Sequence, residues 1–415
     1  MGKYATKLSA SHCSRMRATV QIANEPLVAP LCDNDTQFSR DYRLMPIIHY
    51  LSRILFDFGA IKSLSDEIKR LRIKRPLLVT DRGLESVGTV DKVVEMAKPY
   101  DVTIYSDTTQ NPTEYCLERC VTIWHECNCD GIIGLGGGSS IDLAKAVALI
   151  TSHGGEFVDY DVRTGNSAQI DRVSPHIAIP TGAGTGAEVG RACVMTLNDG
   201  THSIAVNLNM IANTVICDPD LTVTLPAHLT AATGVDALSH GIETFCSTAV
   251  NPPADALAID CLARVSTWLA RAVDEGDNRQ ARYEMMMAAL EGGLALQKGL
   301  GSAHALASPL GEMNYHHGTL LGILMPHVVD FNSVSVPDKV TRLRHVVGVQ
   351  ESQTLADWIT NLVSDIGLPT RLGDLGTTSI DLHTVAKRAY MSHLTHTNPR
   401  SVSVEDYQQL LTAAL

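Results

Sequence analysis

The chain has 415 residues, of which 45% are hydrophobic and 19% charged, and its formal net charge is −12. This length predicts two domains, because a single hydrophobic core rarely extends beyond about 250–300 residues. The acidic balance argues against a nucleic-acid partner, since no basic surplus is present to neutralise phosphates, and no apolar run is long enough to span a bilayer.

The first 44 residues differ in composition from the rest of the chain. Lys3, Lys7, Arg15 and Arg17 all precede the first acidic residue, as in a transit peptide, but apolar periodicity is poor and no cleavage signal is visible. The first six residues also match the short myristoylation pattern, which occurs often by chance. We therefore predict a disordered extension over residues 1–44 and a folded unit that begins near Met45.

Segments with strand and helix character alternate from residue 45 to about residue 225. The predicted strands are 75–81, 102–106, 131–135 and 176–180, and the predicted helices are 66–71, 115–124 and 140–150. Such alternation predicts a parallel sheet with helices on both faces. From Pro226 onward the apolar residues recur at spacings of three and four, which predicts helices over 230–246, 254–273, 280–297 and 356–366. The sequence thus predicts an α/β domain over 45–225 and an all-helical domain over 226–415.

The cysteines do not suggest a metal or disulfide framework. None of the ten repeats as a paired zinc motif, and they are scattered through the chain. This usage is typical of reduced thiols in a cytoplasmic enzyme.

A glycine-rich loop follows the predicted strand 131–135 and opens the next helix. Gly136, Gly137 and Gly138 allow backbone amides to approach a ligand, and Ser139 adds a hydroxyl at the positive end of the helix. The spacing is neither Gly-x-Gly-x-x-Gly nor a Gly-Lys-Ser/Thr loop. An ordinary tight turn would also fit, but this combination favours a pyrophosphate site.

Two further features lie at the same predicted sheet edge. Thr181 and Thr185 belong to a second glycine loop that follows the strand 176–180. Two such loops at the carboxyl ends of parallel strands suggest an extended ligand such as a dinucleotide. Asp81 ends an earlier strand, where a carboxylate can accept from ribose hydroxyls and repel a 2′-phosphate, so it favours NAD over NADP. A helix N-cap is the alternative interpretation of Asp81.

A second constellation lies in the helical half. Asp236 and His240 are four residues apart, so they share one helical face. Their apolar neighbours predict that this face is buried, and a buried charge needs a partner. His304 and His317 would complete a set of one carboxylate and three imidazoles, with a turn expected at 309–311 between them. This set suits Fe²⁺, Zn²⁺ or another first-row metal rather than Ca²⁺ or Mg²⁺.

With these motifs the chain resembles the iron-containing, or group III, alcohol dehydrogenase family from about Ile48 to near the C-terminus. The resemblance rests on FDFGA (56–60), GLGGGSSIDLAK (134–145), IPTGAGTGAEV (179–189), DPDLTVTLP (218–226), TGVDALSHGIE (233–243), GLGSAHALASPLG (299–311), HHGTLLGILMPHV (316–328) and TNPR (397–400). It implies a Rossmann-like NAD-binding domain followed by an all-helical domain, a dehydroquinate synthase-like architecture. The implied activity is hydride transfer between NAD(H) and a small alcohol or aldehyde whose oxygen a metal polarises.

The resemblance also implies roles for particular residues. It implies metal ligands at Asp236, His240, His304 and His317. It implies a cofactor site that comprises Asp81, Asn111, Gly136, Gly137, Gly138, Ser139, Asp142, Lys145, Thr181 and Thr185.

The chain departs from the family at one position. The family often has a histidine four residues after the third ligand, near the nicotinamide, where this chain has Ser308. The loop from 311 to 317 is also shorter than in many relatives. We predict that the proton passes through Ser308 or His316, with bound water or the ribose hydroxyls as alternatives. Replacement of His316 is expected to slow turnover without release of metal.

Two other functions compete with this interpretation. A maleylacetate-reductase-like enzyme would reduce its substrate with NAD(P)H and no metal, and a non-catalytic NAD- or metal-binding protein would show no turnover. A complete ligand set argues against both. Arg191 could contact an anionic substrate group or be a solvated arginine. A homodimer or larger homo-oligomer is expected from the family.

Overall fold

The computed structural model describes residues 48, 50, 52–313, 315–350, 352–376 and 380–415. The predicted disordered extension, residues 1–44, lies outside the described residues. Eight cysteines are within the described part of the chain, and all of them are free thiols.

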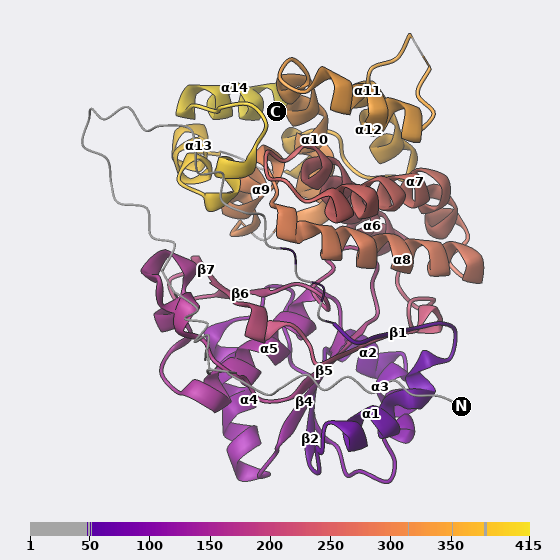
Figure 1. The fold of residues 1–415 in the computed structure, drawn as a ribbon, viewed down its shortest axis with the longest axis vertical. Coiled ribbons are helices and arrows are strands. Elements are labelled where there is room, and N and C mark those ends of the chain that lie inside the picture. The colour runs from indigo at the N-terminus through magenta and orange to yellow at the C-terminus, as the bar shows by residue number, and fades with distance from the viewer. Residues whose placement is uncertain (1–47, 49, 51, 314, 351, 377–379) are drawn as a thin grey trace, which may run out of the picture. The chain divides into compact units, whose positions relative to one another are not determined.

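A six-stranded parallel sheet forms the first half of the described chain (Figure 1). Its order is β1-β8-β5-β4-β2-β3, and every neighbouring pair runs parallel. The strands are β1 (Ile54–Phe56), β2 (Pro76–Val79), β3 (Thr103–Tyr105), β4 (Gly131–Gly136), β5 (His176–Pro180) and β8 (Thr214–Cys217). The central strands β2, β4, β5 and β8 are buried at every position, as expected for a parallel sheet that is covered on both faces.

Helices cover the two faces of this sheet. On one face α1 (Leu64–Arg70) and α3 (Thr89–Met96) pack against Leu78 and Ile133, while on the other α4 (Glu114–Glu126) and α5 (Gly138–His153) pack against Leu77 and Ile132. Neighbouring residues of one strand therefore face opposite cores, which is the two-residue period of a strand. Two additions complete this half: the short helix α2 (Arg82–Ser86) and an antiparallel hairpin of β6 (Ala192–Thr196) and β7 (His202–Val206).

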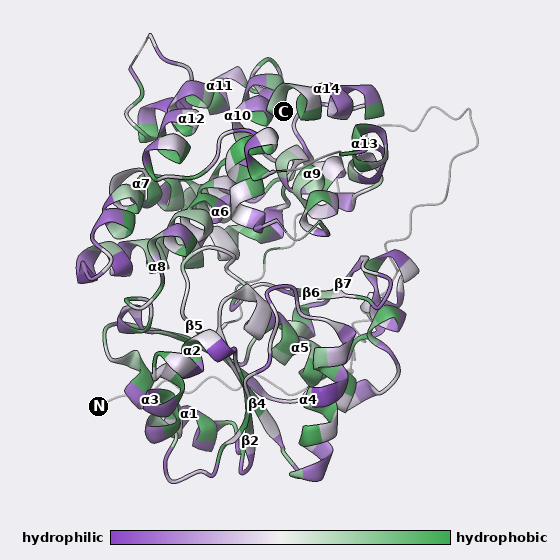
Figure 2. Cartoon of the chain, turned by 180° about the vertical axis from the view of Figure 1, so that it is seen from behind, coloured by the Kyte–Doolittle hydropathy of each residue, from purple (hydrophilic) through white to green (hydrophobic). Residues whose placement is uncertain are grey.

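The second half of the described chain is helical. Its helices are α6 (Ala227–Cys246), α7 (Pro252–Asp274), α8 (Arg279–Ala295), α9 (Ser302–Gly311), α10 (His317–Ser333), α11 (Pro337–Val346), α12 (Leu355–Asp365), α13 (Leu382–Tyr390) and α14 (Val404–Ala414). Figure 2 shows mixed colouring on α7, which buries only one face, and mostly hydrophobic colouring on α5, which is buried along most of its length. Within the described residues, no helix has the length and apolar character needed to cross a membrane.

Short 3-10 turns connect these elements. They span Ala60–Ser63, Phe157–Tyr160, Val162–Thr164, Asn166–Gln169, Leu208–Met210, Pro219–Leu221, Leu296–Lys298, Leu372–Leu375 and His393–Thr397.

The predicted fold class is confirmed, with one local error. The expected turn at 309–311 is wrong, because α9 continues through Gly311 with Pro309 inside the helix. Proline removes one backbone donor and usually breaks a helix. Here it stands in the last turn, and α9 is buried at almost every position, so packing outweighs the lost hydrogen bond.

Candidate metal centre and cofactor site

Helix α6 carries Asp236 and His240 into the interior of the helical half. From Gly234 to Cys246 every residue of α6 is buried, since α7, α8 and α10 all pack against this helix. Asp236 is 4% exposed and His240 is 3% exposed. A carboxylate and an imidazole one turn apart are therefore held together away from bulk water.

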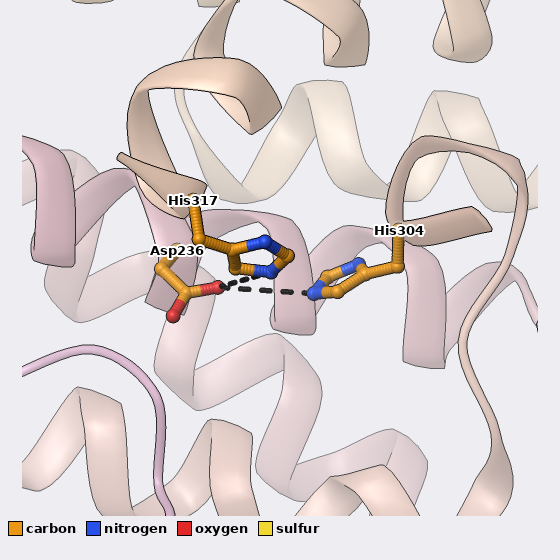
Figure 3. Close-up of side chains that lie close together, drawn as sticks. All are labelled: Asp236, His304 and His317. Atoms are coloured by element: carbon orange, nitrogen blue, oxygen red, sulfur yellow. Dashed lines mark ion pairs between the residues drawn. The ribbon is translucent and has the colours of Figure 1, made fainter. Parts of the chain in front are cut away.

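Two other helices bring further imidazoles to the same carboxylate. His304 lies in the first turn of α9, and His317 is the first residue of α10. Asp236 Oδ1 lies 3.3 Å from His240 Nε2, 3.7 Å from His304 Nε2 and 3.9 Å from His317 Nε2. Figure 3 shows the His304 and His317 rings directed at Asp236. Residues more than 60 positions apart thus converge on one oxygen atom.

The donor atoms of this cluster fit a metal ion. Ligand atoms of Asp236, His304 and His317 all lie within 4.8 Å of one another. His240 does not belong to this group of three, although its Nε2 contacts the same Asp236 oxygen. Asp236 Oδ1 and His304 Nε2 are buried and have no hydrogen-bond partner. Buried polar atoms without partners are costly, and a cation bound among them would satisfy both.

The charges of the cluster are strongly coupled. Burial alone would raise the pKa of Asp236, but the surrounding imidazoles hold it well below its ordinary value. Burial lowers the pKa of His240 and of His317 to about 4, although 43% of the His317 side chain is accessible. Burial also opposes a charge on His304, yet the nearby carboxylates of Asp236 and Glu243 raise the pKa of His304 to about 9. The carboxylate is thus anionic and two imidazoles are neutral near pH 7, as metal ligation requires.

Glu243 is a contact of this cluster that the sequence analysis did not identify. Its Oε2 lies 2.6 Å from His304 Nδ1, and its side chain is also buried. The signal was present, because Asp236, His240 and Glu243 follow one another at spacings of four and three along α6. These spacings place all three on one helical face.

The first glycine loop joins β4 to α5. Gly136 has φ +145°, and an added Cβ there would lie 2.6 Å from Ser140 Oγ, so this position requires glycine. Gly137 is the N-cap of α5 and is exposed, with no side-chain cap. The first backbone amides of a 16-residue helix therefore remain available to an anion.

The other predicted residues of the first loop lie beside it. Asp81 caps α2 by accepting from Leu84 N at 3.0 Å. Its second oxygen would be 3.4 Å from a Cβ on Gly136. Asp81 is therefore both an N-cap and a neighbour of the first glycine loop. Ser139 donates its hydroxyl to the Gln110 carbonyl, which places Asn111 one residue from this contact.

The second glycine loop lies between the first loop and the helical half. Thr181 N donates to Gly136 O at 3.0 Å, and a Cβ on Gly138 would lie 3.0 Å from Thr185 Oγ1. A Cβ at Gly184 would come within 2.4 Å of Thr233 O on α6, only three residues before Asp236. The two loops and the helix of the histidine cluster are thus in direct contact.

Asp142 and Lys145 support this second loop from α5. Lys145 is 1% exposed, and its Nζ donates to the carbonyls of Gly190 and Ala192, each at 2.8 Å. Asp142 Oδ2 accepts from Val194 N at 3.0 Å. Any influence of Lys145 on a cofactor would therefore pass through the position of the loop.

The two predicted proton carriers lie close to the cluster in the chain. Ser308 is one helical turn after His304 on α9 and is partly exposed. His316 is the N-cap residue of α10, next to His317, and its Nδ1 is buried without a hydrogen-bond partner. Burial lowers the pKa of His316.

Comparisons with known proteins agree with this arrangement. The family model described as iron-containing alcohol dehydrogenase matches residues 52–219, and that described as Fe-containing alcohol dehydrogenase family, C-terminal, matches residues 230–415. The chain belongs to the iron-containing alcohol dehydrogenase family. Membership confirms the predicted enzyme class, an NAD-dependent alcohol dehydrogenase or aldehyde reductase.

Three relatives illustrate the likeness of this iron-containing alcohol dehydrogenase to characterised proteins. A 4-hydroxybutyrate dehydrogenase from Cupriavidus necator is 40% identical over 382 residues, which cover 89% of this chain and 100% of the relative. The structure of a 1,3-propanediol oxidoreductase aligns with a TM-score of 0.84 at 30% identity, over 89% of this chain and 100% of that one. A sulfoacetaldehyde reductase from Bifidobacterium kashiwanohense in complex with NAD⁺ aligns with a TM-score of 0.81 at 26% identity, over 89% and 99%. Iron and NAD are the cofactors that the family and this neighbour support.

Proposed function

We propose that this enzyme interconverts a short ω-hydroxycarboxylate and the corresponding aldehyde with NAD(H). The observation that carries the proposal is the 40% identity to a 4-hydroxybutyrate dehydrogenase along that relative's whole length. A four-carbon hydroxycarboxylate has an alcohol at one end and an anion at the other. Its site therefore needs a Lewis acid at one end and a cationic side chain at the other.

The alcohol end is assigned to the histidine cluster. Asp236, His240, His304 and His317 would hold the family's iron ion, with Zn²⁺ as an alternative, because carboxylate and imidazole donors suit these metals. When bound, the metal supplies Lewis acidity that polarises the oxygen of the substrate. The unpartnered Asp236 Oδ1 and His304 Nε2 support this assignment.

The cofactor is assigned to the two glycine loops. Gly136, Gly137, Gly138 and Ser139 would bind the pyrophosphate at the start of α5. Asp81 would accept from the adenosine ribose and disfavour NADP. Asn111, Thr181 and Thr185 would line the remainder of the site, and Asp142 and Lys145 would hold the second loop in place.

The proton is assigned to Ser308 and His316. Both lie within one helical turn of a proposed ligand, and His316 Nδ1 has no partner of its own. A His316→Ala variant should lower kcat while it retains its metal. Unchanged kinetics with full metal content would remove His316 from the relay.

The carboxylate end is assigned to Arg191. This residue directly precedes β6 and follows the second glycine loop, and it is exposed. Its guanidinium makes no hydrogen bond or ion pair with any residue that the structure describes. Partial removal of the guanidinium from water lowers the pKa of Arg191. Its charge also helps to lower the pKa of His393, so the two side chains are near each other. An unpaired guanidinium in a partly desolvated position is suited to bind a carboxylate.

The experiment compares substrates on protein purified without chelators and reconstituted with Fe²⁺. We expect kcat/KM to be highest for 4-hydroxybutyrate, above 1-butanol, 1,3-propanediol and 2-hydroxyethanesulfonate. Arg191→Met should raise KM for 4-hydroxybutyrate by roughly 10–100-fold, the loss of one charge-assisted contact, and leave 1-butanol unchanged. A preference for neutral alcohols, or an equal effect of Arg191→Met on both substrates, would contradict the assignment.

The proposal extends to three properties of the whole protein. We propose the domain boundaries 45–225 and 226–415, a homodimer or larger homo-oligomer, and a cytoplasmic location. The matched family segments, 52–219 and 230–415, support a boundary between them.

A further inference from the structure

Glu243 joins two of the three helices that carry the histidine cluster, α6 and α9. It lies on α6 and is 4% exposed. One carboxylate oxygen accepts from Ala303 N at 2.7 Å, and the other contacts His304 Nδ1 at 2.6 Å and accepts from His304 N at 3.4 Å. A single buried carboxylate therefore holds both the backbone and the ring of His304.

Part of this arrangement is a helix cap. The N-cap residue of α9 is Gly301, which has no side chain to accept from the first backbone amides. Acceptors come instead from other elements, because Asn398 Oδ1 accepts from Ser302 N at 3.2 Å and Glu243 accepts from the next two amides. Capping alone, however, does not require a contact with the imidazole.

The contact with the ring fixes which nitrogen of His304 faces the cluster. A carboxylate only accepts, so the ring nitrogen at 2.6 Å must carry the proton. In the neutral ring, which is the form that binds a metal, His304 Nε2 then has the free lone pair. This atom lies 3.7 Å from Asp236 Oδ1 without a hydrogen-bond partner. We infer that Glu243 is a positioning residue that locks the tautomer and rotation of His304 for metal ligation. This inference rests on the proposed metal centre.

A glutamine at position 243 separates the two roles. Its carbonyl oxygen can still accept from Ala303 N, so the shorter of the two cap contacts on α9 is retained. Its amide group, in contrast, donates to His304 Nδ1 and favours the tautomer with the proton on Nε2, which cannot bind a metal. Asn398→Ala is the matched control, since it removes a cap on α9 but leaves the ring contact intact.

The test titrates metal-free full-length protein with Co²⁺ and follows its visible absorption bands. Wild type and Asn398→Ala should bind one Co²⁺ with affinities within about twofold of each other. Glu243→Gln should bind roughly 10–100-fold more weakly and with shifted bands, the size of effect typical for groups that orient metal ligands. Glu243→Asp, which keeps an acceptor, should lie nearer to wild type. Melting temperatures confirm that each variant is folded.

Two results would overturn the inference alone. Equal Co²⁺ affinity of folded Glu243→Gln and wild type would show that the ring contact is dispensable, while the proposed metal centre stands. An equal loss in Asn398→Ala would reduce Glu243 to a helix cap. If wild type itself binds no Co²⁺, the proposed metal centre fails together with the inference, so the two failures are distinguishable.

Discussion

Individual residues in the two halves of this enzyme meet different physical demands. In the helical half, three buried ionisable side chains and the partly accessible His317 are held together. Their pKa values diverge because burial lowers those of His240 and His317, whereas nearby carboxylates raise that of His304. In the α/β half, the important residues lack side chains. Gly136 and Gly137 place backbone amides at the start of α5, and a side chain at Gly136 would collide with Ser140.

Gly137 provides a test at this scale. Its φ of −74° and ψ of −172° suit alanine, and no atom lies within 4 Å of an added Cβ. A Gly137→Ala variant should fold with an unchanged melting temperature, because the methyl group enters open space. That space is where the pyrophosphate would lie, so KM for NAD should rise roughly tenfold. An unchanged KM for NAD would place the pyrophosphate elsewhere.

At the scale of elements, α5 determines the position of the second glycine loop. Lys145 and Asp142 reach from α5 to backbone atoms at 190, 192 and 194, so the start of β6 is tied to the helix that follows the first loop. Lys145 is buried in α5 because its ammonium group holds these backbone carbonyls in place. Its charge is offset by two carbonyl dipoles, and burial lowers its pKa.

Lys145→Met should therefore affect both stability and cofactor binding. The variant leaves the carbonyls of Gly190 and Ala192 without a donor, which should lower the free energy of unfolding by about 1–3 kcal/mol. KM for NAD should rise as the loop loosens. Asp142→Asn is the control, since an amide oxygen still accepts from Val194 N. Urea unfolding and NAD kinetics measure both effects, and a stability loss with normal KM would separate Lys145 from the cofactor site.

At the scale of the whole molecule, stability depends on buried polar contacts that join segments far apart in the sequence. Glu67 on α1 is 4% exposed and binds Arg53 at 2.9 Å, Arg70 at 2.6 Å and Thr214 at 2.9 Å. Burial would raise the pKa of Glu67, but these three partners lower it from 4.5 to about 2. The carboxylate thus connects α1 to the residue before β1 and to β8, at one edge of the sheet.

This pKa predicts the pH dependence of stability. A depressed carboxylate pKa means that the unfolded chain binds more protons, so the stabilisation is complete above about pH 4.5 and is lost as pH falls toward 2. Glu67→Gln should unfold about 2–3 kcal/mol more easily than wild type at pH 7. The difference should narrow between pH 5 and pH 3 in urea titrations. A difference that stays constant over this range would refute the assignment.

The sequence by itself determined the features that depend on local spacing. Strand and helix alternation gave the fold class, because periods of 2 and 3.6 are properties of neighbouring residues. The glycine loop, and the pairing of Asp236 with His240 on one helical face, were predicted for the same reason.

Tertiary packing decided the features that local spacing does not encode. It kept Pro309 within α9, buried Lys145 under the second loop, and brought Glu243 against a histidine about 60 positions away in the chain. Such contacts depend on which helices cross at which residues, and no local period encodes that geometry.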